Sequence, residues 1–377
     1  MNKFYWILIL LLIASPFLLI LFLLSDPNNS TSNKDYEEKV YVALEADGRV
    51  GVIDAKSKKF ITSINLANVQ NNTFVQYTAH NVQVSPDGQK VLVTANVNRG
   101  SMGSDGEDEE QPVADGLLDQ VFIIDPLTDT IKDSIAIDSD MHLAHVVFNA
   151  ESDIAYVASQ EKGLIYAMDL NVNRVIRIFD LGENSQPHGL RMQPDDSKLF
   201  VALIGKKSLV SLDIRTGEIE SFPLSGAVIQ TAVTPDGQYG LATVYDSKKI
   251  AWVDQQSGQQ GYIDLPIEAK GPVQIYTTPD SQYAYVADQG YYFDQPTANT
   301  VYRINIRQKI VDQTITVGTA PHGVVVNKAG TLVYVTNLLS DDVSVIDVAT
   351  SKEVARVAVG EMPNGVSIWN KQTGGTP

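Results

Sequence analysis

The chain repeats one unit of about 40 residues, the size of a single propeller blade, and this repeat constrains the fold more than any other feature. The clearest copy spans residues 320–359 and holds four apolar runs separated by polar turn signals. Apolar and polar residues alternate within the runs, and many of the apolar ones are β-branched. Such alternation predicts half-buried β-strands, so each unit is expected to be a four-stranded antiparallel sheet.

Seven acidic or amide residues mark the end of the third strand in successive copies. They are Asp54, Asp125, Asp169, Asp213, Asp254, Asn305 and Asp347, at spacings of 71, 44, 44, 41, 51 and 42 residues. The two long spacings indicate insertions. A short polar side chain at such a position bonds a backbone N–H two residues further on and starts a tight turn. We therefore interpret these seven residues as structural.

The repeat is out of phase with the chain ends. Residues 39–66 supply only the second, third and fourth strands of a unit, and residues 363–370 supply only a first strand. Joined, they complete a seventh blade and leave no open sheet edge. The sequence therefore predicts an all-β, seven-bladed β-propeller over residues 39–370, closed by N- and C-terminal strands in one blade. A tail, 371–377, follows.

One copy carries a motif that resembles a known family. Tyr334, Val335, Thr336 and Asn337 spell the motif that names the YVTN-repeat propellers, and the run 343–347 and the Pro-His-Gly turn at 321–323 accompany it. The resemblance covers residues 39–370 and implies the seven-bladed fold. Members similar to this chain include cell-surface and periplasmic binding proteins. Related lactonase-like, amine-dehydrogenase and nitrite-reductase-like propellers carry chemistry, but no residue set proper to them is recognisable in this sequence.

The charge and the cysteine count exclude several classes of function. The formal net charge is −17, which disfavours nucleic acid as a partner because phosphates demand a basic surface. The chain has no cysteine, and this excludes disulfides, thiolate metal sites and thiol catalysis. Protein partners, small polar ligands and metal ions remain.

The first 24 residues are expected to be a transmembrane anchor. Residues 4–24 carry no charge and are long enough to span a bilayer, whereas the apolar core of a signal peptide is usually shorter. Lys3 precedes this run and an acidic segment follows it, which places the propeller on the extracytoplasmic side, periplasmic or cell-surface. Residues 25–38 are polar and predict a linker. In the alternative, 1–24 is a cleaved signal sequence and the propeller is secreted.

Two insertions, 97–118 and 290–298, are expected on one face of the ring. Both join a second strand to a third, and in an up-and-down blade such loops share a face with the starts of the first strands. The first is acidic and Gly-rich, so it is either a solvated loop or a binder of hard cations. The second contains three adjacent aromatic residues that would either bind a partner or fold back and pack: Tyr291, Tyr292 and Phe293.

First strands line the central channel of a propeller, and here one alternating set is polar. These side chains would either contact water or bind a small polar ligand, with Arg191 as the strong cationic contact. The candidate ligand-binding residues are Asn81, Gln83, Arg191, Gln230, Gln274 and Tyr276.

All five histidines lie within two residues of a first-strand start. Four of them come from three consecutive blades and are candidate metal ligands: His80, His142, His145 and His188. Imidazole nitrogen suits zinc or copper, and Met102 in the acidic insertion would favour cuprous copper. The alternative is that the Pro-His-Gly histidines bond backbone between blades. His322, on the seventh blade, is expected to lie across the ring and to take no part.

The sequence shows no recognisable catalytic motif: it lacks G-x-S-x-G, H-E-x-x-H and a phosphate loop. The leading hypothesis is therefore a membrane-anchored extracytoplasmic binding module that recognises a partner or small ligand on the insertion-bearing face. The alternative is a lactonase-like enzyme, or an electron-transfer or metal-handling propeller, that acts at the channel mouth.

Overall fold

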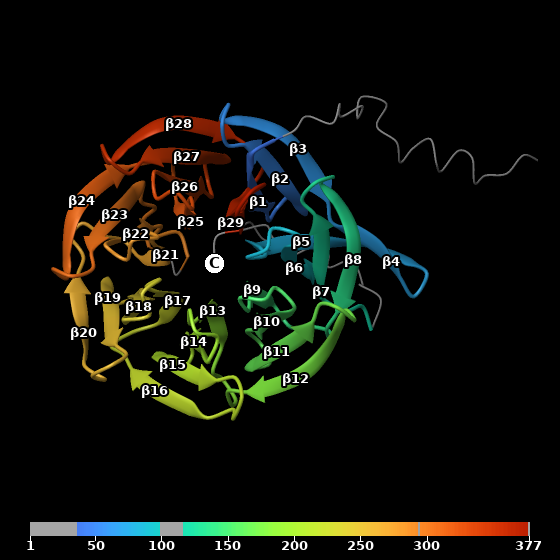
Figure 1. Ribbon diagram of the computed structural model, residues 1–377, viewed down its shortest axis with the longest axis horizontal. Coiled ribbons are helices and arrows are strands. Elements are labelled where there is room, and N and C mark those ends of the chain that lie inside the picture. Colours follow the sequence, from blue (N-terminus) through green and yellow to red (C-terminus); the bar gives the residue numbers. More distant parts are fainter. Residues whose placement is uncertain (1–35, 99–115, 293–294, 376–377) are drawn as a thin grey trace, which may run out of the picture. The chain divides into compact units, whose positions relative to one another are not determined.

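The computed structural model describes residues 36–98, 116–292 and 295–375, and in these ranges the chain forms seven antiparallel sheets. Figure 1 shows the sheets arranged as blades around a central channel. The innermost strands contact one another in ring order, β5, β9, β13, β17, β21, β25 and β29, and β29 returns to β5. The predicted seven-bladed, all-β propeller is therefore confirmed.

Blades 1 and 2 carry the irregular features of the ring. Blade 1 consists of β1 (Glu38–Leu44), β2 (Arg49–Asp54), β3 (Lys59–Asn65), β29 (Pro363–Asn370) and β30 (Gly374–Gly375). Blade 2 consists of β4 (Ala67–Gln70), β5 (Thr73–Val84), β6 (Val91–Val97), β7 (Gln120–Asp125) and β8 (Thr130–Ala136).

The other five blades have four strands each. Blade 3 consists of β9 (Leu143–Phe148), β10 (Ile154–Ser159), β11 (Leu164–Asp169) and β12 (Arg174–Asp180). Blade 4 consists of β13 (Pro187–Met192), β14 (Lys198–Leu203), β15 (Ser208–Asp213) and β16 (Ile219–Pro223). Blade 5 consists of β17 (Val228–Val233), β18 (Tyr239–Val244), β19 (Lys249–Asp254) and β20 (Gln260–Asp264). Blade 6 consists of β21 (Pro272–Thr277), β22 (Tyr283–Asp288), β23 (Thr300–Asn305) and β24 (Ile310–Thr316). Blade 7 consists of β25 (Pro321–Val326), β26 (Leu332–Asn337), β27 (Asp342–Asp347) and β28 (Lys352–Ala358).

The strand that closes the ring comes from the C-terminal part of the chain, as predicted. β29 pairs with β1, with Lys39 opposite Trp369. The Trp369 indole donates a 2.8 Å hydrogen bond to the carbonyl of Gly88 in blade 2. Lys39 is almost fully buried and forms a 2.8 Å ion pair with Asp129, also in blade 2. These contacts join the closing blade to its neighbour.

The long spacing between Asp54 and Asp125 has two causes, of which the sequence analysis recognised one. Residues 67–76 form an added hairpin, in which β4 pairs with the first part of β5, and Figure 1 shows it projecting from the ring. The other cause is the acidic insertion. Leu117 is buried and the N–H of Leu118 bonds the Gln70 side chain, so the predicted insertion 97–118 includes residues that belong to the folded blade.

The predicted anchor falls outside the described residues. Within the ranges that the structure describes, no helix has the length and apolar character needed to cross a membrane. The predicted tail does include a described element, because β30 pairs with β29 and Gly375 donates a 2.9 Å hydrogen bond to the Ser85 carbonyl.

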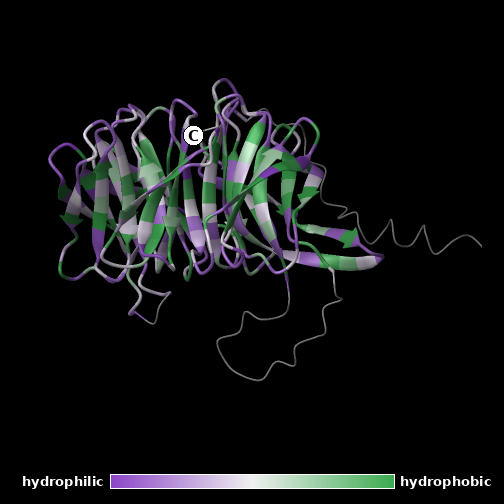
Figure 2. Cartoon of the chain, turned by 90° about the horizontal axis from the view of Figure 1, so that it is seen from below, coloured by the Kyte–Doolittle hydropathy of each residue, from purple (hydrophilic) through white to green (hydrophobic). Residues whose placement is uncertain are grey.

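Hydrophobic residues are concentrated in the strands and hydrophilic residues in the connecting loops at both ends of the ring, as the colours in Figure 2 show. Several apolar residues of the inner strands, including Val82, Val146, Leu190 and Ile275, are completely buried. Each such side chain stabilises the folded state by about 1.5–3 kcal/mol. The core therefore consists of the interfaces between neighbouring blades.

The seven residues at the ends of the third strands act as turn formers, as predicted. In five of them the carboxylate accepts a hydrogen bond from the N–H two residues on, for example from Leu127 to Asp125 at 2.8 Å. Asn305 and Asp347 bond the N–H three residues on instead. These side chains start the outer turns and lie away from the channel.

Every inner strand has a register shift, which lies near the strand start in six of them and between Ala79 and Asn81 in the longer β5. In β13, for example, the shift lies between Pro187 and Leu190, and the other six shifts occupy equivalent places. A β-bulge lets neighbouring residues leave strict alternation and re-aims their side chains. Consecutive positions at the start of each inner strand can therefore both reach the channel.

In three blades, the hydroxyl of a threonine on the second strand accepts a hydrogen bond from a backbone N–H at the bulge. The Thr336 hydroxyl accepts from the N–H of Gly323 and donates to the carbonyl of Asn364 in the next blade, both at 2.7 Å. Thr94 and Thr243 make the equivalent pairs of bonds. The threonine of the YVTN motif therefore joins one blade to the next.

Replacing this hydroxyl by a methyl group should destabilise the ring. We expect Thr336→Val to lower the free energy of unfolding by about 2–4 kcal/mol, because a buried N–H and a buried carbonyl both lose their partner. Thr336→Ser keeps the hydroxyl and should lose less than about 1 kcal/mol. Urea unfolding of both variants measures the difference. Equal stability of the two would contradict this role.

Candidate functional sites at the two ends of the channel

Three buried histidines from consecutive blades meet at one end of the channel. One ring nitrogen from each of His80, His145 and His188 lies within 4.8 Å of the others. The ring centroids are 5.1 Å apart for His145 and His188 and 5.4 Å apart for His80 and His188. The structure therefore brings together three of the four candidate metal ligands in one cluster, here called the histidine cluster.

The bulges explain how this cluster forms. His188 is the second residue of β13, and His80 lies in the equivalent register shift of β5, between Ala79 and Asn81. His145 is the third residue of β9, so strict alternation would separate it from the other two. At the level of the bulge the two kinds of position face the same space. The imidazoles therefore meet because the bulges change the direction of the backbone at these positions.

Two of the three imidazoles present a free nitrogen. The Nδ1–H of His188 donates a 3.0 Å hydrogen bond to the carbonyl of Ile229, which leaves Nε2 as the unprotonated nitrogen. Nε2 of His80 is buried and has no hydrogen-bond partner. An imidazole that donates one N–H to a backbone carbonyl is oriented in the way that metal-ligating histidines usually are.

A buried carboxylate lies behind His80. Oε1 of Glu45 is 3.8 Å from the His80 Nδ1, and Oε2 accepts a 2.6 Å hydrogen bond from Asn364. Burial raises the pKa of Glu45, but its contacts with His80 and Asn364 together outweigh burial and hold that pKa below its ordinary value. Glu45 is therefore an anion beside the cluster.

The side-chain amides of Gln230 and Gln274, here called the amide layer, lie beside His145. The Gln274 Nε2 is 3.0 Å from the His145 Nε2, and the Gln230 Nε2 is 3.2 Å from Nδ1. Gln230 also donates to the Gln274 Oε1 at 2.8 Å. The neighbouring residue of blade 4 must be glycine, because a Cβ at Gly189 would lie 2.0 Å from the Gln230 Oε1. The layer holds the His145 ring in place.

His145 and His188 are neutral at physiological pH. Burial, followed by the proximity of other histidines, holds the pKa of His145 and of His188 well below the ordinary value. A neutral imidazole is the form that binds a metal ion. These two histidines are therefore ready to coordinate without first losing a proton.

The remaining two histidines lie at the margins. His142 is exposed, and its ring centroid is 5.2 Å from that of His80. The expectation that His322 lies across the ring is wrong: only blade 1 separates its blade from that of His80, and the His80 charge lowers its pKa. His322 is outside the cluster, and its Nδ1 lies 2.8 Å from the Gln289 amide.

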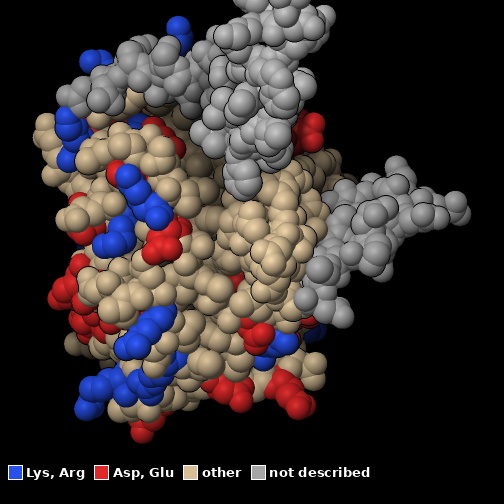
Figure 3. All heavy atoms as spheres, turned by 90° about the vertical axis from the view of Figure 1, so that its right-hand side faces the viewer, with Lys and Arg blue, Asp and Glu red and all other residues tan. Residues whose placement is uncertain are grey.

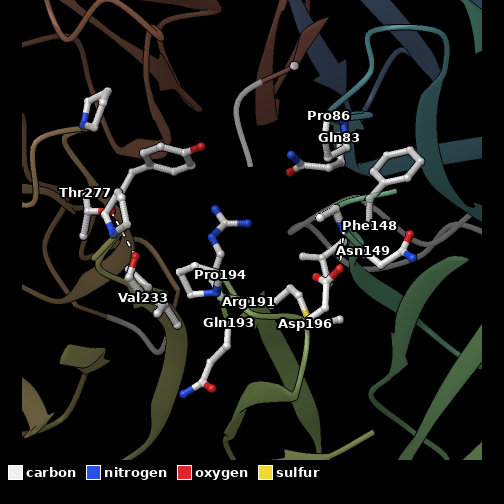
Figure 4. Close-up of a pocket in the computed structure, with 18 of the residues that line it drawn as sticks. Gln83, Pro86, Phe148, Asn149, Arg191, Gln193, Pro194, Asp196, Val233 and Thr277 are labelled. Atoms are coloured by element: carbon white, nitrogen blue, oxygen red, sulfur yellow. Dashed lines mark hydrogen bonds between the residues drawn. The ribbon is translucent and has the colours of Figure 1, made fainter. Parts of the chain in front are cut away.

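A separate pocket opens at the opposite end of the channel. The inner strands start at the histidine cluster and end here, so His188 and Arg191 are separated by about 10 Å at the rise of a β-strand. The cavity measures about 420 Å³. Figure 4 shows Arg191 extending into it, with Gln83 on the facing side.

The predicted ligand-binding residues are therefore divided between the two ends. Gln83, Arg191 and Tyr276 line the pocket, which we call the arginine pocket. Gln230 and Gln274 belong to the amide layer beside His145. The Asn81 side chain accepts a 3.2 Å hydrogen bond from the N–H of Val146 and so joins blades 2 and 3.

Most of the walls of the arginine pocket could not be predicted from the sequence pattern. Pro86, Pro194, Pro235 and Pro279 belong to the turns that follow inner strands, and they line the cavity. Phe148, Met192 and Val326 are the last residues of their inner strands and line it as well. The signal that could have found them is their shared position at the ends of the inner strands.

The insertion-bearing face is described only in part. Phe293, the acidic residues 99–115 and Met102 lie outside the described residues. Tyr291 is exposed, whereas Tyr292 packs edge-on against His322 with ring centroids 5.8 Å apart. Of the two predicted behaviours, Tyr291 shows the exposure that partner binding requires, and Tyr292 folds back and packs.

Charged side chains on the outer strands are of both signs. On the side of the ring shown in Figure 3, acidic and basic residues are interspersed, and the basic ones form no continuous band in that view. Over the whole sequence, acidic residues outnumber basic ones by 45 to 28.

Solved structures share the fold. A chain of hydrazine synthase from Kuenenia stuttgartiensis is similar with a TM-score of 0.60 and 16% identity, over 78% of this chain and 92% of that chain. Virginiamycin B lyase from Staphylococcus aureus is similar with a TM-score of 0.60 and 13% identity, over 79% and 93%. No protein-family model and no curated protein matches the chain. These similarities define a seven-bladed β-propeller protein, and the YVTN resemblance stays a prediction.

Proposed function

We propose that this chain is an extracytoplasmic, membrane-anchored binding module that takes up a transition-metal ion at the histidine cluster. The observation that carries the proposal is the convergence of three buried imidazoles from blades 2, 3 and 4. The anchor and the location rest on the uncharged run 4–24. Zinc and copper are the ions that such nitrogen ligands suit.

The geometry requires a small contraction on binding. Zinc–nitrogen bonds of about 2.0–2.1 Å place tetrahedral ligand atoms about 3.4 Å apart, whereas the three nitrogens lie within 4.8 Å of one another. His145 would exchange one amide contact for the ion. A fourth position is left for His142, for the Glu45 carboxylate or for water.

Titration of the chelator-treated protein with zinc and with cupric ion tests the proposal. We expect one equivalent to bind with micromolar or tighter affinity. His80→Ala and His188→Ala should each weaken binding at least about 100-fold, since loss of a residue that only hydrogen-bonds and orients a metal ligand already costs about 10–100-fold. His322→Ala is the matched control, because it removes a buried histidine at the same strand position, and it should bind like the parent.

Two outcomes would overturn the metal site: no saturable binding by the parent domain, or unchanged binding in both cluster variants. The predicted alternative, a lactonase-like or electron-transfer propeller, would act at this same end, because three protein ligands leave an open position on zinc. Turnover of lactones by the zinc-loaded parent, lost in His188→Ala, would favour that alternative over simple binding.

Partner recognition by the insertions stays a separate proposal. Residues 99–115 and 293–298 are the segments to delete, because Leu117 and Tyr292 pack into the fold. Binding of a partner that survives both deletions would exclude this role.

A further inference from the structure

The arginine pocket lies at the opposite end of the channel from the histidine cluster, and a different set of residues lines it. The inference begins from Arg191, whose half-buried guanidinium lies in the cavity. No carboxylate of the described residues lies within ion-pair distance of it, and its aromatic contact is Tyr276, with the guanidinium carbon 5.0 Å from the ring centroid. A cation held away from water without a counter-ion costs free energy, so an anionic ligand is the natural complement.

Most of the cavity wall is apolar. Phe148, Met192, Val233 and Val326 contribute side chains, and the prolines of four inner turns line the cavity with them. Pro194, Pro235 and Pro279 are exposed, which places them at the rim. A pocket of about 420 Å³ with apolar walls and few polar groups matches the usual form of a small-molecule site.

The charges that line the pocket favour a ligand with a single negative charge. Arg191 and Lys328 are the cations, and Asp196 is an anion. Asp196 accepts a 2.8 Å hydrogen bond from the N–H of Ala150 at the wall. The balance is one positive charge, which suits a carboxylate better than a doubly charged phosphate. The planar guanidinium presents two parallel N–H groups that match a carboxylate.

We propose that the arginine pocket binds an amphipathic monocarboxylate, with its carboxylate on Arg191 and its apolar body against Phe148, Met192 and Val326. Arg191 lies three residues beyond His188 on β13, about 10 Å along the strand, so the ligand would bind at the opposite end of the channel from the metal ion.

The test uses a series of straight-chain monocarboxylates from butyrate to decanoate, titrated calorimetrically into the chelator-treated full chain. We expect saturable binding that tightens with chain length until the pocket is full. Arg191→Met keeps the volume and the apolar stem, and it should weaken carboxylate binding about 10- to 100-fold. It should leave the weak binding of the matching alcohols unchanged.

Arg177→Met is the matched control. Arg177 also stacks on an aromatic ring, at 4.2 Å from Phe179, but it lies outside the pocket, so this variant should bind like the parent. His80→Ala should also retain carboxylate binding, and this result separates the arginine pocket from the metal site.

The melting midpoint of Arg191→Met gives an independent readout. A cation kept for a ligand is not needed for folding, so the midpoint should not fall. A marked fall would mean that Arg191 is structural and would overturn the proposal. So would the absence of saturable binding across the series, or equal affinity in the parent and in Arg191→Met.

Discussion

Removal of residues 361–377 is expected to abolish cooperative folding of the propeller. The deletion takes away β29, the inner strand of blade 1, and exposes the edge of β1 in the closing blade. Val366, Ile368 and Trp369 are buried, and at about 1.5–3 kcal/mol each they alone account for about 5–9 kcal/mol. That is comparable to the whole stability of a typical domain.

Thermal unfolding and light scattering of the truncated protein measure this effect. A chain that ends after Asn370 is the matched control, because it keeps β29 and loses only β30, and it should unfold cooperatively. Added peptide 361–377 should restore folding in trans, since it supplies the missing strand. A truncated protein with the melting midpoint of the parent would refute the closure argument.

The fold could be predicted from sequence because its information is local and repeated. Each blade restates the same alternation and turn chemistry, and the incomplete copies at 39–66 and 363–370 can pair only with each other. The hairpin of β4 and β5 was missed for the same reason. Residues 67–76 alternate like any blade strand, so the pattern does not separate an added hairpin from the sheet that it extends.

The sequence could predict which histidines lie near one another, but it could not predict which of their side chains meet. The repeat register places His80, His145 and His188 at neighbouring first-strand starts, whatever the exact backbone. Which side chains meet depends on the bulges, and a bulge leaves no reliable trace in alternation. Strict alternation also grouped Arg191 with Gln230, although the two side chains serve opposite ends of the channel.

The arginine pocket depends on what neighbouring side chains leave empty. At the level of Arg191 and Tyr276, blades 3 and 5 supply the small residues Val147 and Ala232, which also line the cavity. A repeat pattern shows that a position is apolar. The volume left empty between seven such positions depends on the side chains of all seven blades together, and the pattern of one blade does not predict it. Turn prolines complete the rim, and their sequence signal is the same whether or not a cavity lies beside them.

The chelator-treated protein is expected to lose stability steeply as the pH falls from 6.5 to 4. Burial, followed by the charge of His80, lowers the pKa of His322 from 6.5 to about 4, while Glu45 and Asn364 act in the opposite direction. Between these values the unfolded chain binds a proton that the folded chain does not. Stability is therefore complete above pH 6.5 and declines below it, by about 3 kcal/mol for His322 alone.

His145 and His188 act in the same sense, because their pKa values are also lowered by burial. Burial raises the pKa of Glu38 and of Asp288, and these carboxyls oppose the trend, so the contribution of one histidine requires a comparison of variants. His322→Gln keeps an acceptor for the Gln289 amide and removes the titrating ring. Urea unfolding at pH 7 and at pH 4.5 should show that this variant loses about 2–3 kcal/mol less than the parent. If parent and variant lose the same amount, His322 is not buried in its neutral form.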